Sequence, residues 1–288
     1  MKIFLGSAQF GSDYGVTNSK GKISKKEVFK ILDYARKNGV DSIDTAYSYG
    51  ESEKVLGEYG ISEFRISTKL PSLKNETSIK KKNIKDFFFK SLRRMKIEKI
   101  DNLFLHDSLD LLSVNREEVL DALVELKQEG FINQIGASIY DPEEVNFISE
   151  IECINIIQCP LNILDKRILE SKYRRLMISK DIKLQARSIF LQGILLEDLS
   201  NLSKYFSKYK KVFLAWENFI EDKNISKLEA CINYLRSIKD LDSFVVGVSS
   251  LLELKQIIST LKAKRFSVTF NSEALAVDLI DPRKWKRE

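Results

Sequence analysis

The chain has 288 residues, of which 43% are apolar and 31% are charged, a profile typical of a soluble globular protein. The net charge of +6 is modest, and the basic cluster of Lys80, Lys81, Lys82 and Lys85 is expected to be the solvated side of a helix. A nucleic-acid surface needs a denser basic face with interleaved aromatic residues. No apolar run approaches the roughly 18 residues that a membrane span needs. Composition therefore excludes a nucleic-acid-binding protein and an integral membrane protein.

The cysteines and the N-terminus predict a cytoplasmic protein. Cys153, Cys159 and Cys231 are odd in number and lack the paired spacing of a metal site, so reduced thiols are expected. The chain opens on a strand-like segment rather than on the basic region and long apolar core of a secretory leader.

Strand-like and helix-like segments alternate in the first half of the chain. Strands are predicted at residues 2–6, 40–44, 64–69 and 100–106, and helices at residues 24–37, 51–58, 78–95 and 117–128. Ser24 can cap the first helix, with Glu27 at the capping-box position. A loop rich in glycine, serine and asparagine, residues 7–21, lies between the first strand and this helix.

The alternation continues to the end of the chain. Strands are predicted at residues 134–138, 155–158, 183–186 and 244–246, and helices from residue 142 and at residues 167–178, 226–238 and 251–261. A longer excursion covers residues 187–223, and a C-terminal extension ends near Trp285.

Eight strand–helix units without a low-complexity linker predict an α/β fold, a (β/α)8 TIM barrel with a C-terminal extension, formed by residues 1–288 as a single domain. A doubly wound open sheet is the alternative. That fold favours a glycine-rich first turn for a dinucleotide, and residues 11–15 lack this fingerprint.

Ionisable side chains end three consecutive strands. Asp44 ends the second strand, Lys69 the third, and His106, the only histidine, the fourth. The carboxyl ends of parallel strands share one face of a barrel, so these groups should converge, and Tyr49 follows Asp44 closely enough to join them. Each of these residues, taken alone, is more often a helix cap or a core side chain. Their occurrence together at the ends of adjacent strands indicates a functional site.

The combination suits carbonyl reduction. Free tyrosine has a pKa near 10, and a neighbouring lysine ammonium is expected to lower the pKa of Tyr49. Asp44 can keep a buried Lys69 charged. Tyr49 then serves as a general acid toward a carbonyl oxygen that His106 orients. No side chain supplies a hydride, so a cofactor must.

The sequence resembles the aldo-keto reductase family. Residues 44–53 with Leu56 and Gly57 look like its signature, and Lys69 and His106 match its other catalytic positions. The resemblance spans essentially the whole chain and implies a nicotinamide cofactor, NADP(H) or NAD(H), bound without a Rossmann domain. It implies that Tyr49 is the proton donor, that Lys69 and Asp44 tune it, and that His106 orients a small aldehyde or ketone.

The same resemblance implies the residues that bind the cofactor. Ser138 and Gln158 look like contacts of the nicotinamide amide. Residues 187–193 resemble the segment that covers the pyrophosphate, and residues 246–250 resemble the adenosine-phosphate loop. The implied cofactor residues are Ser138, Gln158, Arg187, Ser188, Gln192, Gly193, Gly247, Ser249, Ser250 and Glu253.

Three positions depart from the family pattern. Ile139 stands where many members have Asn, and Arg187 stands where many have an aromatic ring that stacks on the nicotinamide, although a guanidinium plane can also stack. Glu253 lies near the Arg of many NADPH-preferring members; it would repel a 2′-phosphate but could accept a bond from a free 2′-hydroxyl. Lys255 lies close enough to compensate, so the choice of dinucleotide is open.

Several alternatives stay open. Residues 6–15 resemble the loop of a bacterial-type subgroup associated with sugars, which points to a sugar or sugar derivative as substrate. A cofactor-binding regulatory or sensor protein on the same barrel is the main alternative function. A metal-dependent hydrolase usually needs several histidine or carboxylate ligands, which disfavours it here. The sequence leaves the oligomeric state open.

Overall fold

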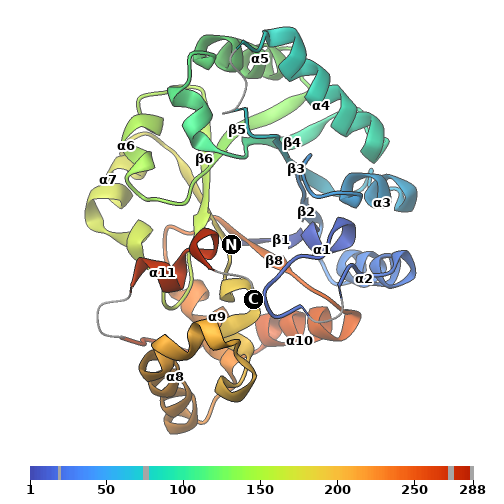
Figure 1. Cartoon of the computed structure of the whole chain (residues 1–288). Helices are drawn as coiled ribbons and strands as arrows, with labels where there is room; N and C mark the ends of the chain where they lie inside the picture. Colours follow the sequence, from blue (N-terminus) through green and yellow to red (C-terminus); the bar gives the residue numbers. More distant parts are fainter. Residues whose placement is uncertain (19–20, 74–77, 272–275, 286–288) are drawn as a thin grey trace.

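Eight short parallel strands close into a barrel in the computed structural model, which describes residues 1–18, 21–73, 78–271 and 276–285. The strands are β1 (Lys2–Gly6), β2 (Ser42–Asp44), β3 (Arg65–Leu70), β4 (Ile100–Leu105), β5 (Ile132–Ser138), β6 (Ile154–Pro160), β7 (Lys183–Arg187) and β8 (Ser243–Gly247). Each strand pairs with the next in sequence, and β1 pairs with β8 to complete the ring (Figure 1). The predicted (β/α)8 barrel is confirmed, and the open sheet is excluded.

Helices surround the barrel. They are α1 (Ala8–Gly11), α2 (Lys25–Lys37), α3 (Ser52–Tyr59), α4 (Lys81–Met95), α5 (Arg116–Gln128), α6 (Glu144–Ile148), α7 (Ser171–Ser179), α8 (Lys210–Lys223), α9 (Lys227–Ser237), α10 (Leu251–Lys262) and α11 (Val277–Ile280). Short 3-10 turns are η1 (Ser108–Leu112), η2 (Arg167–Leu169), η3 (Leu191–Leu196), η4 (Leu199–Asn201), η5 (Lys204–Tyr209) and η6 (Pro282–Lys284). Several neighbouring helices pack together, among them α3 with α4, α4 with α5, α9 with α10, and α10 with α2.

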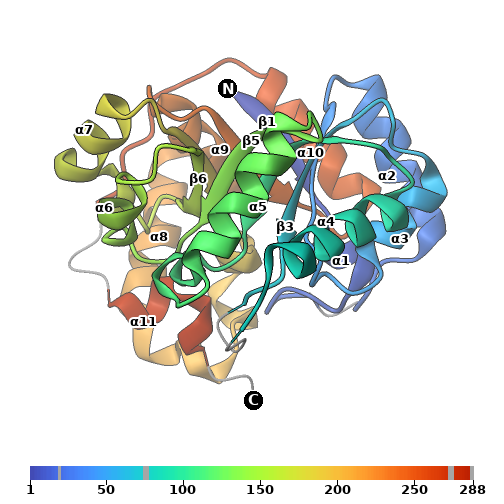
Figure 2. The ribbon, with the colours of Figure 1, turned by 90° about the horizontal axis from the view of Figure 1, so that it is seen from above.

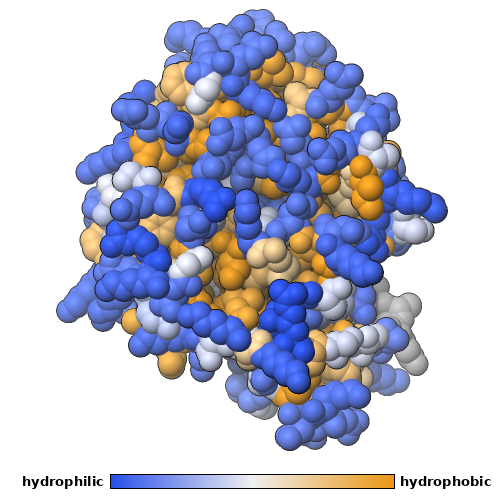
Figure 3. All heavy atoms as spheres, turned by 180° about the vertical axis from the view of Figure 1, so that it is seen from behind, coloured by the Kyte–Doolittle hydropathy of each residue, from blue (hydrophilic) through white to orange (hydrophobic). Residues whose placement is uncertain are grey.

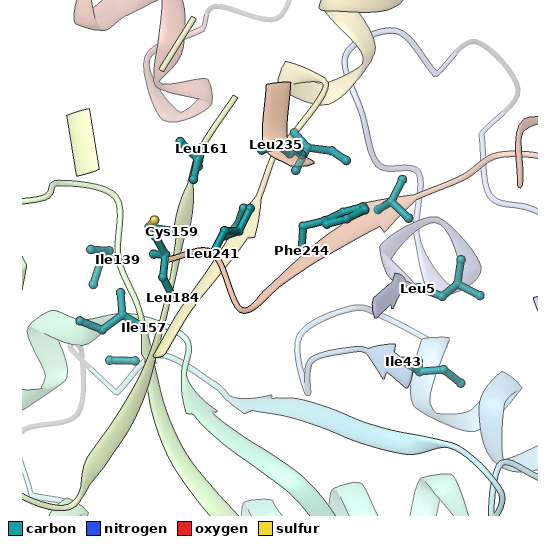
Figure 4. Packing of buried hydrophobic residues seen from close by; sticks show 14 of the residues in the cluster. Leu5, Ile43, Ile139, Ile157, Cys159, Leu161, Leu184, Leu235, Leu241 and Phe244 are labelled. Carbon is teal, nitrogen blue, oxygen red and sulfur yellow. The ribbon is translucent and has the colours of Figure 1, made fainter. Parts of the chain in front are cut away.

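Apolar side chains of the helices and strands pack into one buried cluster. The α2 face predicted from helical spacing is buried, namely Val28, Ile31, Leu32 and Ala35. Figure 4 shows part of the shared core, including Leu5 of β1, Ile43 of β2 and Phe244 of β8, all with no exposed surface. Because neighbouring residues of a strand face opposite sides, polar side chains that alternate with these apolar ones point into the barrel. Because Ile43 packs against the helices, the side chain of its neighbour Asp44 points into the barrel.

Some predicted boundaries were wrong. The helix expected from Ser78 begins at Lys81, because Lys80 is extended and its amide donates to Asn83 Oδ1 at 3.1 Å. The helix expected at residues 167–178 is divided at Glu170, which leaves η2 and α7 as separate elements. The excursion after β7 contains α8, whose buried Phe213 and Trp216 anchor it to the core.

The two ends of the barrel differ. Figure 2 shows the N-terminus at one end and α11 at the other, so the strands carry their carboxyl ends toward α11. The end away from α11 is mostly hydrophilic, with apolar side chains in small separate patches (Figure 3). Among the described residues, no helix is long and apolar enough to cross a bilayer. The three cysteines form no disulfide.

Candidate active site

Strand register brings the predicted ionisable groups together. Asp44, the last residue of β2, pairs in register with Ser67 of β3, and Lys69 of β3 pairs with Phe104 of β4. His106 follows β4 immediately. The three side chains therefore start from one end of three adjacent strands, as the sequence predicted.

Lys69 and Asp44 form a buried ion pair. Lys69 Nζ lies 2.6 Å from Asp44 Oδ2, and the two side chains are only 1% and 4% exposed. The ammonium also donates to the carbonyl oxygen of Thr45 at 3.0 Å. The free-energy cost of removing two charges from water commonly exceeds the gain from their attraction. A contribution to folding stability therefore does not by itself explain an ion pair buried this deeply.

A chain of amides holds the second oxygen of Asp44. Gln158 Nε2 donates to Asp44 Oδ1 at 2.8 Å and to Gln185 Oε1 at 2.7 Å. Gln185 Nε2 in turn donates to Ser243 Oγ at 3.0 Å. This buried relay runs from β2 through β6 and β7 to β8 and fixes the direction of the Asp44 carboxylate. Sequence reasoning missed Gln185, which sits inside β7 rather than at its end.

Tyr49 lies between the ammonium and the imidazole. Lys69 Nζ is 5.2 Å from the centroid of the Tyr49 ring. The Tyr49 and His106 rings meet edge to face, with centroids 5.9 Å apart and planes at 83°. The structure therefore brings together all four residues predicted to be catalytic.

The pKa of Tyr49 differs from the expectation. Burial, and then the Asp44 carboxylate, raise the pKa of Tyr49 above its ordinary value, whereas a lowered value was expected from Lys69. The main physical reason is burial, which disfavours the charged phenolate; in addition, the Lys69 charge is paired with Asp44, whose carboxylate repels a phenolate. Tyr49 is therefore a protonated phenol over the whole neutral range.

His106 is neutral at neutral pH. Burial, with smaller contributions from the Lys69 and Arg187 charges, lowers the pKa of His106 to about 4. A neutral imidazole carries one N–H donor, which can bind a carbonyl oxygen without adding a charge.

A cavity of about 450 Å³ extends from this centre toward α10. Predicted site residues that line it are Asp44, Tyr49, Gln158, Arg187, Ser188, Gln192, Gly193, Gly247, Ser249 and Glu253. Lys69, which is fully buried, and His106, which contacts Tyr49, do not line the cavity. Ser138 is buried at the end of β5 in register with Gln158, and Ser250 caps α10; neither lines the cavity. The roles of all these residues in binding stay predictions.

The cavity also has lining residues that the sequence did not single out. Gln9 comes from α1, Thr17 from the loop that follows α1, and Gln256 from α10. The glycine-rich composition of that first loop was the available signal. A second hollow of about 280 Å³ lies at the opposite end of β7, beside Lys183, and none of the predicted site residues lines it.

Two loops meet across the cavity. Thr17 Oγ1 donates to the carbonyl oxygen of Gln192 at 3.0 Å. Gly193 has a φ of +96°, and a Cβ there would lie 2.0 Å from Thr17 Oγ1. Only glycine permits both this backbone conformation and this close approach.

Arg187 packs against Tyr140. Its guanidinium carbon lies 4.1 Å from the centroid of that ring, and its NH2 group donates to the carbonyl oxygen of Ile139 at 2.9 Å. Arg283, from the C-terminal segment, lies 3.9 Å from the same ring centroid. The sequence did not single out Tyr140 or Arg283.

Two carboxylates occupy the start of α10. Glu253 Oε2 accepts from the Ser249 amide at 2.7 Å, and Glu27 Oε1 accepts from the Leu251 amide at 2.9 Å. The expected capping box of α2 is therefore incomplete: Ser24 Oγ accepts from the Glu27 amide, but the Glu27 carboxylate crosses to α10. That bond from Leu251 is the main cause that lowers the pKa of Glu27.

Among the residues that the structure describes, no three His, Cys, Asp or Glu side chains group closely enough to hold a metal ion. A metal-dependent hydrolase therefore has no ligand set in that part of the chain.

Comparisons with known proteins point to one family. Residues 2–274 match the model of the Aldo/keto reductase family. The chain is 27% identical over 266 residues to the uncharacterized oxidoreductase YqkF of Bacillus subtilis (strain 168), covering 84% of this chain and 85% of that protein. It is 27% identical over 289 residues to the NADH-specific methylglyoxal reductase of Escherichia coli (strain K12), covering 91% and 86%.

A solved structure has the same fold. The holo form of aldo-keto reductase AKR11C1 from Bacillus halodurans superposes with a TM-score of 0.75 at 20% identity, covering 92% of this chain and 88% of that one. D-arabinose 1-dehydrogenase of Saccharomyces cerevisiae (strain ATCC 204508 / S288c) is 23% identical over 278 residues, covering 88% and 80%.

Proposed function

The chain belongs to the aldo/keto reductase family and is an NAD(P)H-dependent oxidoreductase, and on that premise we propose that it reduces a small aldehyde or ketone to an alcohol. The observation that carries the proposal is that Tyr49, which lines the cavity with Asp44, contacts both the buried Lys69–Asp44 pair and His106. A sugar or sugar derivative is the proposed substrate class, supported by the loop at residues 6–15 and by the polar side chains of Gln9, Gln192 and Gln256 in the cavity lining.

The cofactor would lie along the cavity. Gln158 uses its amide hydrogens on Asp44 and Gln185, which leaves Oε1 as an acceptor for the N–H of a carboxamide. Ser188 and Gly193 line the cavity where a pyrophosphate would lie, and Gly247 and Ser249 line it where an adenosine would lie. The residues present therefore fit a nicotinamide dinucleotide, which supplies the hydride when bound.

Tyr49 would transfer its proton to the carbonyl oxygen of the substrate. His106, neutral at neutral pH, would donate an N–H to the same oxygen and hold it beside the phenol. The phenolate left behind is next to the Lys69 ammonium, which stabilises the negative charge. Asp44 keeps Lys69 in place and charged, and Gln158 keeps Asp44 in place.

We further infer that NADH binds more tightly than NADPH. A helix N-terminus usually attracts a phosphate through its free amides. The amides of Ser249 and Leu251 at α10 already donate to the carboxylates of Glu253 and Glu27. Glu253 lines the cavity, whereas Glu27 does not line it and pairs with Lys30 at 3.4 Å. A 2′-phosphate placed there would be repelled mainly by Glu253, whereas a free 2′-hydroxyl could donate to it.

The test of the catalytic proposal is a phenol-to-phenyl exchange. Tyr49→Phe is expected to lower kcat for aldehyde reduction by on the order of 100-fold or more, because the proton donor is lost. Tyr47→Phe is the matched control, since Tyr47 packs against Phe87 and Arg94 away from the cavity. Binding of cofactor would be measured in both variants.

Two outcomes oppose the proposal. Equal turnover by Tyr49→Phe and the parent would show that Tyr49 is not the acid. Tight cofactor binding with negligible turnover on every aldehyde, ketone and sugar tried would instead favour a sensor built on the same barrel.

A further inference from the structure

The charges at the reacting end of the cavity do not cancel. Asp44 is the acidic residue that lines this end, and Lys69 neutralises it at 2.6 Å. The other lining acids are Glu197, which follows η3, and Glu253 at the start of α10. Among the charged residues that line this end, Arg187 adds a positive charge that the Lys69–Asp44 pair does not offset.

Arg187 has no acidic partner within the described residues. Its hydrogen bonds there go to the carbonyl oxygen of Ile139 at 2.9 Å and, at the outer limit, to Ser188 Oγ at 3.5 Å. A guanidinium has five N–H donors, so most of its donors are not used by these contacts. The side chain is only partly exposed, and a partly buried charge is stabilised strongly by an oxyanion that accepts two of its hydrogens.

The Tyr140 ring restrains the guanidinium of Arg187 on one face. Tyr140 covers one face of its guanidinium, with the ring centroid 4.1 Å away. Arg283 covers the opposite face of the Tyr140 ring and is itself fixed by Asp281 at 2.7 Å. Stacking on aromatic rings and bonding to a carbonyl restrict the rotamers of an arginine, which lowers the entropy lost on binding an anion.

Arg187 acts on the reacting groups rather than on the adenosine end. Burial is the first cause of the pKa shifts of Tyr49, His106 and Lys69, and the charge of Arg187 contributes to each of them. Its bond to Ile139 also places it beside the end of β5, where Ser138 and Gln158 lie in register.

We propose that the carbonyl substrate carries an oxyanion group, a carboxylate or a phosphate, and that Arg187 binds this group beside Tyr49. The inference rests on the proposed reductase function and narrows its substrate class. The guanidinium fork matches the geometry of both oxyanions, and the Lys69 charge, paired with Asp44, is not available to compete for them.

Matched substrate pairs test the proposal. Succinic semialdehyde is compared with butanal for the carboxylate, and glycolaldehyde phosphate with glycolaldehyde for the phosphate, all at saturating cofactor. The parent enzyme is expected to favour the anion of at least one pair by about tenfold or more in kcat/KM, the effect of a charge-assisted hydrogen bond. The pair that shows the preference identifies which oxyanion is bound.

Three variants locate the effect. Arg187→Gln is expected to bring the anion-to-neutral ratio near unity, and Arg187→Lys to keep part of it. Arg283→Gln is the matched control. It also removes a guanidinium, from the other face of the same ring, but Asp281 already neutralises the charge of that guanidinium. That ratio should be unchanged in Arg283→Gln. An effect of Arg187 on cofactor binding would change kcat/KM for both substrates of a pair alike, so it cancels in their ratio. The Kd of the cofactor is measured separately.

The outcomes are distinct. Parent turnover of neutral aldehydes without preference for either anion would overturn this inference and leave the reductase proposal standing. An Arg187→Gln variant whose NADH Kd rises while the ratio stays the same would show that Arg187 serves only the cofactor. Absence of turnover on all four compounds and on neutral sugars would instead count against the reductase proposal itself.

Discussion

Asp44 binds a different partner with each carboxylate oxygen. Oδ2 accepts from Lys69 at 2.6 Å and Oδ1 from Gln158 at 2.8 Å, so the carboxylate cannot rotate without breaking a buried bond. Lys69, bonded also to the Thr45 carbonyl, is equally restricted. Preorganised charges of this kind stabilise a developing charge without first having to reorient, which suits a phenolate forming at Tyr49.

His106 makes a prediction about stability and pH. Its pKa is about 4 in the folded chain against an ordinary value of 6.5, so the unfolded chain binds the proton first as pH falls. Stability associated with neutral His106 is therefore present above pH 6.5 and is lost progressively toward pH 4, by at most about 1.4 kcal/mol per pH unit.

Urea unfolding at a series of pH values measures this effect. The free energy of unfolding of the parent is expected to fall more steeply between pH 6.5 and 4 than that of His106→Gln, with parallel behaviour above pH 6.5. Parallel curves through the whole range would mean that His106 titrates normally in the folded chain.

At the scale of single residues, the sequence predicted where the proposed catalytic residues lie, but not the burial and the partners that set their pKa values. Topology puts the last residues of adjacent strands together, so the meeting of Asp44, Lys69 and His106 followed from strand order alone. The direction of the Tyr49 pKa shift depends on burial and on where the Lys69 charge goes, which no linear spacing encodes. The partner of the Glu27 carboxylate lies 224 residues away, and a local capping pattern suggested the wrong acceptor bond.

Among the elements, α10 lines the far end of the cavity, and α2 packs against α10. Ser250 caps α10 through the Glu253 amide, and the Glu253 and Glu27 carboxylates take two more amides. The contact between α2 and α10 joins the first long helix of the barrel to its last. These hydrogen bonds therefore hold α2 and α10 together. They also place the carboxylates of Glu253 and Glu27 at the start of α10, which we call the negative edge of the proposed cofactor site.

Dinucleotide binding tests this negative edge. Fluorescence titration of the parent is expected to give a Kd for NADPH about tenfold or more above that for NADH, about 1.4 kcal/mol of repulsion. Removing both charges, in Glu27→Gln with Glu253→Gln, should narrow the gap by improving NADPH binding. Glu51→Gln, which only loses an exposed pair with Lys54, should keep it.

Two results contradict the account of this edge. One is a parent that binds NADPH as tightly as NADH. The other is a double variant whose preference stays as large as that of the parent, since the carboxylates would then have no part in the choice.

Element type was easier to predict than element ends. Helical spacing of apolar residues identified α2 and its buried face correctly. The start of α4 and the break between η2 and α7 depend on single backbone angles at Lys80 and Glu170, which periodicity does not report. The excursion after β7 hid α8, although Phe213 and Trp216 lie at helical spacing within it.

At the scale of the molecule, the C-terminal segment is tied to the barrel. Trp285 meets Phe206 of η5 edge to face with centroids 5.2 Å apart, and Arg283 covers Tyr140 at the end of β5. The segment thus supports the arginine proposed to bind the substrate. That residues 1–288 form a single domain stays a prediction, consistent with these contacts between the chain's last described residues and the barrel.

The central claim is that this barrel transfers a hydride from a nicotinamide to a carbonyl carbon while Tyr49 supplies the proton. The most direct measurement uses NADH carrying deuterium at its transferable position, with mass spectrometry of the alcohol product. The account predicts one deuterium on the former carbonyl carbon for the parent and loss of that product in Tyr49→Phe. An alcohol formed without deuterium, or no alcohol from any carbonyl compound despite bound NADH, would contradict it.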